Sequence, residues 1–249
     1  MTLDDLPTPC LVLDLGKLKA NLARMQAAVS RHPRLVLRPH MKTAKSIAVA
    51  DLAAPGKGPI TVSTVAEARY FAGGGFQDQI YAVGITPAKL DAIAALNAQG
   101  GDVKVITDDA DVAAAIAAHP GPLRALVEVD CGEGRGGVTP DGNLLAEIAG
   151  RLGARCAGVM THAGHSYAER SEAGIETVAE AEHRGAVLAA ERLRAMGVSV
   201  DVVSLGSSPT ALYGKDMGGI TDVRAGVYMF GDLFQAQIGT HGMDDIAVT

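Results

Sequence analysis

The chain has 249 residues, a length that suits one (β/α)8 barrel or two small domains. Hydrophobic residues make up 48% of the chain, which excludes a disordered protein, and 22 basic against 28 acidic side chains give a net charge of −6, which disfavours nucleic-acid and anionic-membrane partners. Because Trp is absent and aromatic residues reach 4%, base-stacking surfaces are disfavoured and an aliphatic core is expected.

The cysteines and the N-terminus bear on the compartment. Cys10, Cys131 and Cys156 lie far apart and form no CxxC pair, which disfavours a disulfide framework and a structural zinc site. Asp4 and Asp5 stand where a secretory signal needs basic residues, and no uncharged apolar run approaches the roughly 18 to 20 residues of a membrane helix. We therefore expect a soluble, cytoplasmic protein.

Short runs rich in β-branched residues predict eight buried strands that alternate with amphipathic helices. This alternation predicts a parallel sheet, and the length and the apolar strands favour a closed (β/α)8 TIM barrel over an open doubly wound sheet. The predicted strands are residues 35–37, 60–63, 80–83, 103–106, 126–129, 157–161, 200–205 and 221–224. The predicted helices are residues 16–29, 66–72, 87–99, 109–119, 142–152 and 168–196.

Two segments lie outside this alternation. TPCLVLDL at 8–15 predicts a ninth strand, which should pair with something other than the barrel. DIAVT at 245–249 resembles the start of another strand, and an exposed half-strand is a poor terminus. We expect residues 1–15 to belong to a second, β-rich domain, residues 16–235 to form the barrel, and residues 236–249 to begin a C-terminal domain that this chain lacks.

In a barrel of this kind the chemistry lies where strands end and loops begin. Lys42 follows the first predicted strand, in RPHMKT at 38–43. It is either a solvated surface cation or an amine whose pKa burial lowers, which would make it a nucleophile toward carbonyls. Arg135 follows the fifth strand among glycines and could donate to an oxyanion or remain solvated in a flexible turn. Cys131 is interpreted as a packing residue.

The later strand ends carry further polar residues. His162 and His165 could bind a metal, but neither an HxH nor an HExxH pattern accompanies them. GSSPT at 206–210 opens a helix, where serine hydroxyls and free N–H groups could bind phosphate or simply cap the helix. RAGVY at 224–228 adds a second arginine and a tyrosine. Together these groups suit a phosphorylated aldehyde with a phenolate oxygen, which describes pyridoxal 5′-phosphate (PLP).

The same segments resemble the D-threonine aldolase and D-serine dehydratase family. These are fold-type III PLP enzymes with a barrel of the alanine racemase N-terminal type, followed by a C-terminal β-domain. The matches run in the expected order through essentially the whole chain, and RPHxKT is the most specific. They are RPHMKT at 38–43, STVAEARYFAGGG at 63–75, VDCGEGRGG at 129–137, THAGHSY at 161–167, LGSSPT at 205–210 and VRAGVYMFGD at 223–232.

The resemblance implies a role for each matching position. Lys42 would form the Schiff base with PLP and take the α-proton, and His162, near the pyridine ring, would be the second catalytic residue. Arg135 would donate to the phenolate oxygen. Arg224 would face the pyridine nitrogen and leave it unprotonated, and Tyr167 would reach toward the substrate. The phosphate would be held by Ser207, Ser208, Gly226, Val227 and Tyr228.

Two departures from the family pattern matter. The family usually has RPHxKTHK, whereas Ala44 follows Thr43 here, so one histidine is missing beside the lysine. In the family the C-terminal β-domain supplies metal ligands near the substrate hydroxyl and completes the active site across a dimer. A divalent metal, Mn²⁺ or Zn²⁺, is therefore expected only together with that domain, and we assign no metal ligand within this sequence.

The resemblance implies a PLP-dependent lyase acting on small D-3-hydroxy amino acids, of the D-threonine aldolase or D-serine dehydratase type. The intact enzyme would be a metal-assisted homodimer, and activity of the chain as given is an open question. One alternative is a non-catalytic PLP-binding protein of cofactor homeostasis with the same barrel, and another is an amino-acid racemase. A third is a metal-dependent hydrolase that uses His162 and His165.

Overall fold

The computed structural model describes residues 5–249, and within them eight parallel strands form one sheet in the order β1-β8-β7-β6-β5-β4-β3-β2. Between β1 and β2 the ring is joined through the pair His40–Thr61, beside which the Met41 amide donates to the Thr61 carbonyl at 2.8 Å. The sheet is a nearly closed (β/α)8 barrel, which confirms the predicted fold. The strands are β1 Val36–Pro39, β2 Ile60–Val62, β3 Asp78–Gly84, β4 Asp102–Thr107, β5 Arg124–Val129, β6 Cys156–Thr161, β7 Val202–Leu205 and β8 Asp222–Ala225.

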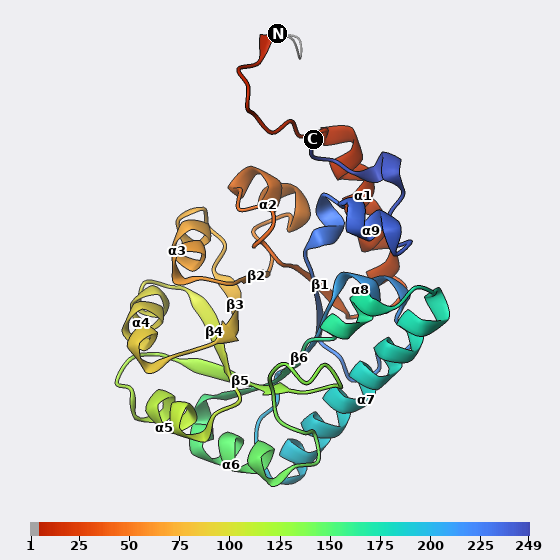
Figure 1. Cartoon of the computed structure of the whole chain (residues 1–249). Helices are drawn as coiled ribbons and strands as arrows, with labels where there is room; N and C mark the ends of the chain where they lie inside the picture. Colours follow the sequence, from red (N-terminus) through yellow and green to blue (C-terminus); the bar gives the residue numbers. More distant parts are fainter. Residues whose placement is uncertain (1–4) are drawn as a thin grey trace.

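Helices α3 to α7 lie outside the ring of strands (Figure 1). Side-chain caps set several of their first residues: Thr64 accepts from the Glu67 amide at the start of α3, and Ser171 accepts from the Gly174 amide at the start of α7. The predicted helix at 168–196 therefore begins later, after a 3₁₀ turn. The helices are α1 Leu15–Val29, α2 Ile47–Ala53, α3 Val65–Gly73, α4 Leu90–Ala98, α5 Ala110–Ala118, α6 Asn143–Leu152, α7 Glu172–Ala195, α8 Ser208–Tyr213 and α9 Leu233–Gln237.

The core has two parts that share the strands. Residues such as Val223 and Ala225 pack outward against the helices in one large apolar cluster. The lumen holds a smaller apolar cluster without aromatic residues, as expected, and it also contains charged side chains that the sequence did not predict. Each of these charged side chains is at most 5% exposed and alternates along its strand with outward-facing residues. They are Arg38, Lys104, Asp222 and Arg224.

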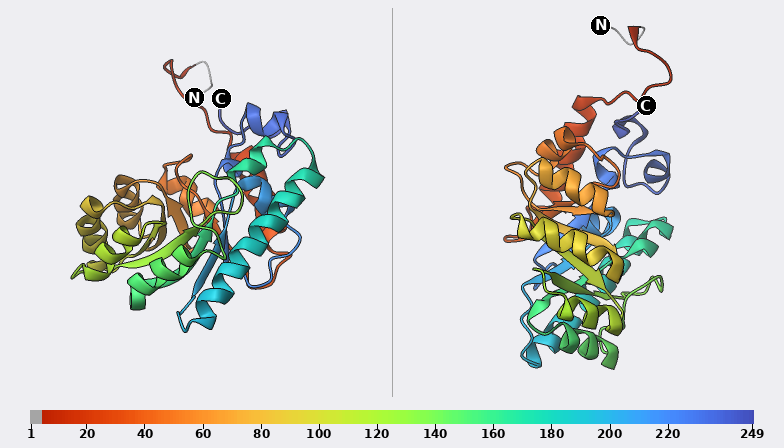
Figure 2. Two further views of the ribbon diagram at one scale, coloured as in Figure 1. Left: turned by 60° about the horizontal axis from the view of Figure 1, so that its bottom comes forward. Right: turned by 90° about the vertical axis from the view of Figure 1, so that its left-hand side faces the viewer.

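The segments that precede and follow the barrel meet each other. Predicted strands at 8–15 and 245–249 are wrong as strands, because the structure has one antiparallel bridge there, between Leu13 and Val248. The amides of Val12 and Asp14 donate to the carbonyls of Thr249 and Ala247 at 2.8 Å. In both views of Figure 2 the N-terminal segment lies beside the C-terminus. Residues 1–4 of the segment 1–15, which was expected to belong to a second domain, lie outside the described residues, and the predicted domain boundaries stay predictions.

From residue 5 to residue 249, no helix is both long enough and apolar enough to cross a membrane. Cys10 is exposed, Cys131 is partly buried and Cys156 is buried, and all three are free thiols.

Candidate active site

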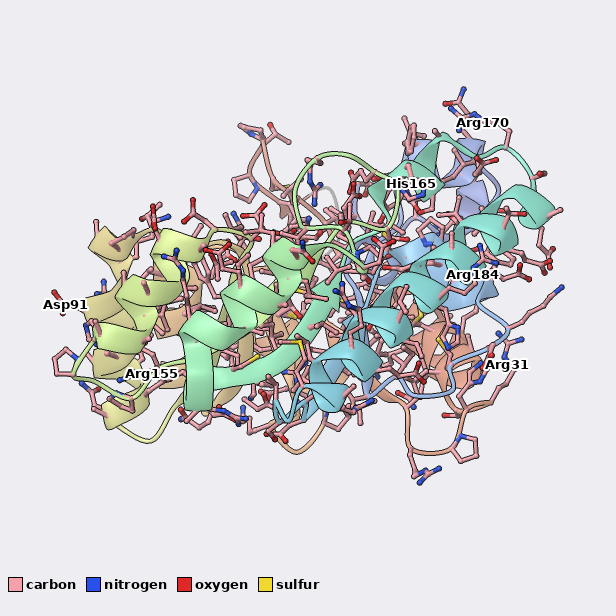
Figure 3. The ribbon with its side chains drawn as sticks, turned by 90° about the horizontal axis from the view of Figure 1, so that it is seen from below. Arg31, Asp91, Arg155, His165, Arg170 and Arg184 are labelled. Carbon is pink, nitrogen blue, oxygen red and sulfur yellow. The ribbon has the colours of Figure 1, made fainter. Side chains whose placement is uncertain are left out.

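A cavity of about 100 Å³ opens at the carboxyl ends of the strands. Figure 3 shows His165 and Arg170, which follow β6, on one side of the molecule and Arg155, which precedes β6, on the other. The structure brings nine of the ten predicted site residues to this cavity, and the exception is Tyr228, which is buried beyond its lining. The nine are Lys42, Arg135, His162, Tyr167, Ser207, Ser208, Arg224, Gly226 and Val227.

Lys42 lies at the mouth of the cavity, in the loop between β1 and α2, next to the fully buried Met41. Partial burial lowers the pKa of its amine, and the positive charges of Arg135 and Arg224 lower it further. The amine makes no hydrogen bond or ion pair with any residue from 5 to 249, so its lone pair is free when it is neutral. Such an amine can attack a carbonyl carbon.

The glycine-rich loop after β5 is shaped by two carboxylates. Asp130 accepts from the amides of Gly132 and Gly134 at 2.9 and 3.1 Å, and Asp108 accepts from the Gly137 amide at 2.8 Å. Gly137 has a φ of +94°, and a Cβ there would lie 2.6 Å from the Asp130 nitrogen. A residue with a side chain would therefore displace the loop.

Arg135 is carried by this loop to the mouth of the cavity. Its side chain is 59% exposed and lies 3.4 Å from a carboxylate oxygen of Glu133. An exposed ion pair of this kind is weak, so the guanidinium can exchange Glu133 for another anion. The arrangement fits a donor that engages an oxyanion on arrival of a ligand.

His162 is held as a neutral ring with a defined tautomer. Its Nδ1 hydrogen-bonds the Gly206 carbonyl, and because a carbonyl oxygen only accepts, Nδ1 carries the proton. Burial and the neighbouring Arg224 lower the pKa of the ring to about 3. The Nε2 atom is consequently unprotonated at neutral pH and can only accept a hydrogen bond.

The loop between β7 and α8 forms a donor-rich wall of the cavity. Ser207 caps α8 through a reciprocal pair with Thr210, and its hydroxyl lies 2.8 Å from that of Ser166. The Ser208 amide donates to the Tyr167 hydroxyl at 3.3 Å. The Ser208 hydroxyl is 1% exposed, lines the cavity and has no partner within the described chain. A buried hydroxyl without a partner is costly, which points to a ligand group at this position.

Gly226 lets the backbone approach the opposite wall. A Cβ at Gly226 would lie 2.8 Å from the His40 carbonyl oxygen, so β8 and the loop after β1 could not keep their present separation with a larger residue. Val227 follows as the first residue of a 3₁₀ turn, Val227–Met229. The Tyr228 hydroxyl in this turn is buried and has no partner within residues 5–249.

Arg224 is almost fully buried at 4% exposure, and it reaches the cavity from β8. It donates to the Ser204 hydroxyl at 2.9 Å and to the Thr161 carbonyl. Burial lowers the pKa of this guanidinium, but an arginine starts so high that it keeps its charge at neutral pH. The cavity thus contains a permanent buried cation.

Sequence reasoning missed Glu182, a fully buried carboxylate on α7. It accepts from the Thr161 hydroxyl and the Gly206 amide at 2.9 Å and from the Thr210 hydroxyl at 2.7 Å, so it fastens the β7–α8 loop to β6. A signal was present in the sequence, because Glu182 lies four residues from both Val178 and Ala186 within the apolar stripe of the helix.

The cavity also has a titratable wall that sequence reasoning did not identify. Burial raises the pKa of the Glu128 carboxyl, and the negative charge of Asp108 raises it further. Burial and the charge of Lys42 hold the pKa of His40 well below its usual range. The sequence did contain a signal for Glu128, because a carboxylate inside an otherwise apolar strand is unusual. The remaining lining residues that were not predicted are Thr43, Ala82, Met160, Gly206 and Ala225.

No group of three His, Cys, Asp or Glu side chains within residues 5–249 is arranged to hold a metal ion. His162 has one ring nitrogen committed to a backbone carbonyl, and the Nδ1 atom of His165 is buried without a partner. The described residues therefore do not fit a divalent metal, and we derive no step through one. The hydrolase alternative has no support in this part of the chain.

Comparisons with known proteins place the chain among related barrels. A family model described as "Alanine racemase, N-terminal domain" matches residues 13–233. The chain is 41% identical to D-threo-3-hydroxyaspartate dehydratase of Delftia sp. (strain HT23), over 100% of this chain and 67% of that protein. It is 34% identical to D-threonine aldolase of Arthrobacter sp., over 90% and 61%.

A solved structure agrees with this relationship. The D-threo-3-hydroxyaspartate dehydratase from Delftia sp. HT23 superposes with a TM-score of 0.94 at 42% identity, covering 98% of this chain and 66% of that one. The chain thus spans about two thirds of the length of these relatives. Because the family match covers nearly the whole barrel and is supported by close relatives, the chain belongs to the alanine racemase N-terminal domain family.

Proposed function

We propose that this chain is the cofactor-binding barrel of a PLP-dependent lyase that acts on small D-configured 3-hydroxy amino acids. The observation that carries the proposal is one cavity that holds two arginines together with an amine and a buried hydroxyl that have no partner among residues 5–249. Relatives named as a dehydratase and an aldolase of such substrates support it. The predicted cytoplasmic location and homodimer accompany this proposal.

The donor set of the cavity fits PLP. The cofactor's phosphate needs several hydrogen-bond donors, and no group of residues 5–249 competes for the Ser208 hydroxyl. Ser207 shapes the same loop by capping α8, and Gly226 and Val227 present backbone from the facing strand end. Tyr228 was predicted to bind the phosphate directly, but it lies behind this wall, so we propose that it supports the wall from the core.

Each charged group would have a separate task. When bound, PLP would supply an electron sink for negative charge at the α-carbon of an amino acid. Lys42 would hold the cofactor through its amine and move the α-proton, and its lowered pKa increases the neutral fraction that can do so. Arg135 would donate to the phenolate oxygen. Arg224 would face the pyridine nitrogen, and because a guanidinium only donates, it would leave that nitrogen without a proton.

The remaining side chains would set the shape and polarity of the site. The neutral His162 ring would pack beside the pyridine ring, and its Nε2 atom could accept but not give a proton. Burial raises the pKa of Tyr167, so its hydroxyl keeps its proton and could donate toward the substrate. Whether the reaction is dehydration or cleavage of the Cα–Cβ bond depends on the groups near the substrate hydroxyl. The described residues form no metal site that could act on this hydroxyl.

Borohydride trapping tests the proposal. The protein is mixed with PLP, reduced with borohydride, freed of excess cofactor and digested, and the modified lysine is located by mass spectrometry. We expect PLP on Lys42, and no trapping at this position in Lys42→Ala. Lys45→Ala is the matched control, since Lys45 lies on the same loop with 62% of its side chain exposed. Equal trapping of PLP by Lys42→Ala would refute the assignment.

Product analysis then separates the reactions. Ammonia release from D-serine or D-threo-3-hydroxyaspartate would indicate a dehydratase, and aldehyde release from D-threonine an aldolase, each measured with and without Mn²⁺ or Zn²⁺. Exchange of the α-proton without either product would indicate a racemase. PLP trapped on Lys42 without turnover of any of these substrates would favour the cofactor-homeostasis alternative.

A further inference from the structure

A line of ionic contacts runs through the barrel lumen from the amino ends of β3 and β4. The Lys104 amine lies 3.2 Å from Asp78, and Asp78 accepts two hydrogen bonds from Arg38, at 2.9 and 3.2 Å. The Nε atom of Arg38 lies 3.4 Å from the Oδ2 atom of Asp222. Charges of opposite sign alternate along this line, which is how the lumen can hold Arg38, Lys104 and Asp222 at no more than 5% exposure, while the Asp78 side chain at the end of the barrel is 42% exposed.

The same line continues into the cavity through Asp222. Its Oδ1 atom accepts from the Ser204 hydroxyl, and the Ser204 oxygen accepts from Arg224 Nη1 at 2.9 Å. Parallel pairing of β7 with β8 places Ser204 directly opposite Asp222. A guanidinium only donates and a carboxylate only accepts, so the order of donation, from Arg224 to Ser204 to Asp222, has a single direction.

We propose that Ser204 and Asp222 are positioning residues that hold the Arg224 guanidinium at the wall of the cavity, against the pyridine nitrogen of PLP. The inference rests on the proposed function. Two of the five N–H groups of Arg224 are fixed, one by Ser204 and one by the Thr161 carbonyl, so the plane of the guanidinium is set before a ligand binds. An arginine otherwise keeps many rotamers, and ordering it in advance removes that cost from ligand binding.

A substitution of Ser204 can distinguish the positioning of Arg224 from a purely structural role of Asp222 as the counter-ion of Arg38. Asp222 uses Oδ2 for Arg38 and Oδ1 for Ser204, so its ion pair with Arg38 and its hydrogen bond from Ser204 involve different oxygens and can be removed separately. Removing the Ser204 hydroxyl cuts the contact with Arg224 and leaves the ion pair between Asp222 and Arg38. If Asp222 serves Arg38 alone, that removal should not reach the cofactor.

The test uses the whole chain loaded with PLP that carries nitrogen-15 in its pyridine ring. The nitrogen-15 NMR shift reports the protonation and hydrogen bonding of that atom, and equilibrium dialysis gives the dissociation constant for PLP. In Ser204→Ala we expect a shifted nitrogen-15 signal and PLP binding weakened by about three- to tenfold, the effect of one hydrogen bond. Ser204→Thr, which restores a hydroxyl, should return both values toward those of the unaltered chain.

Asp78→Asn is the matched control. It breaks the other ionic contact of Arg38, at a site remote from Arg224, and should leave the nitrogen-15 signal and PLP affinity unchanged. If Ser204→Ala does not fold, Ser204→Cys, whose thiol is only a weak hydrogen-bond partner, takes its place with the same expectation and leaves the ion pair between Asp222 and Arg38 intact. The inference is overturned if Ser204→Ala changes neither value while Arg224→Gln changes both. If Arg224→Gln also leaves the signal unchanged, the proposed placement of Arg224 itself is wrong.

Discussion

At the scale of single residues, His162 shows how burial fixes the state of a side chain. The His162 Nδ1–H group donates a hydrogen bond to the Gly206 carbonyl. Desolvation and the positive charge of Arg224 lower the pKa of the ring to about 3. The neutral ring is therefore a property of the fold and does not require a ligand. The same environment makes the stability of the protein depend on pH.

We expect His162 to destabilise the protein as the pH falls. Its folded pKa of about 3 lies below the ordinary 6.5, so the unfolded chain binds a proton between these values and the folded chain does not. Stability is therefore lost on acidification from about pH 6.5 to about pH 3. At pH 5 this amounts to about 2 kcal/mol, from 1.36 kcal/mol per pH unit. Urea unfolding at pH 7 and pH 5 measures the free energy of unfolding. Between these pH values, His162→Gln should lose less of it than the unaltered chain, and the difference should equal that amount.

His32→Gln serves as the control for that measurement. His32 follows α1, away from the cavity, and its replacement should leave the acid-induced loss unchanged. Identical pH dependence in His162→Gln and His32→Gln would show that the His162 ring is not held neutral by the fold.

Single residues differed in how well the sequence predicted them. Lys42 and Arg135 were predicted from short motifs at strand ends, because a strand end in a barrel is a place where polar side chains converge. Tyr228 does not line the cavity, and its predicted contact with the phosphate stays a prediction, since the direction of a side chain in a 3₁₀ turn cannot be derived from the motif. Glu182 is far from every motif along the chain and reaches the β7–α8 loop through packing of α7.

At the scale of elements, the eight strands were predictable because each combines β-branched residues with a following helix. Helices α2 and α9 were not predicted, and with seven and five residues they are too short to show a helical period. The segment at 8–15 has the composition of a strand, but a strand needs a partner along its length. Within the described chain its partner is residues 247–249, so one bridge forms there.

The loop after β5 offers a test at this scale. Gly137→Ala should destabilise the protein by clearly more than the roughly 1 to 2 kcal/mol of a positive φ, because its Cβ would also lie 2.6 Å from the Asp130 nitrogen. Displacement of the loop should move Arg135 and weaken PLP binding. Gly134→Ala is the control: its φ is also positive, at +66°, but nothing lies within 4 Å of the added carbon. Equal unfolding free energies and PLP affinities for the two variants would contradict this account.

At the scale of the whole molecule, the barrel was predictable and its charged lumen was not. Arg38, Lys104 and Arg224 each stand between apolar residues in the sequence, and Asp222 stands between Thr221 and Val223; one charged residue in a strand does not reveal what it faces. Their pairing depends on the register between β1, β7 and β8, which brings Asp222 between Arg38 and Ser204. Register is a property of the assembled sheet, and no local pattern contains it.

The two ends of the described chain are joined through α1. The Asn21 side chain donates to the carbonyls of Met229 and Asp245, at 3.2 and 2.8 Å, and Arg24 donates to the Thr240 carbonyl. These contacts bring residues 247–249 alongside residues 12–14. Helix α1 therefore holds the segment that follows β8. The short bridge between Leu13 and Val248 depends on these contacts of α1.

Hydrogen exchange tests this junction. The amides of Val12 and Asp14 donate to carbonyls of Thr249 and Ala247, so they should exchange slowly in the whole chain. In a chain that ends at Ile246 both acceptors are gone, and we expect exchange at these two amides to accelerate by about tenfold or more.

The Leu18 amide, which donates to the Asp14 carbonyl within α1, should keep its rate. Leu11→Ser, which alters a side chain that is 84% exposed in the same segment, should leave all three rates unchanged. Unaltered exchange at Val12 and Asp14 in the shortened chain would mean that the two ends do not pair in solution.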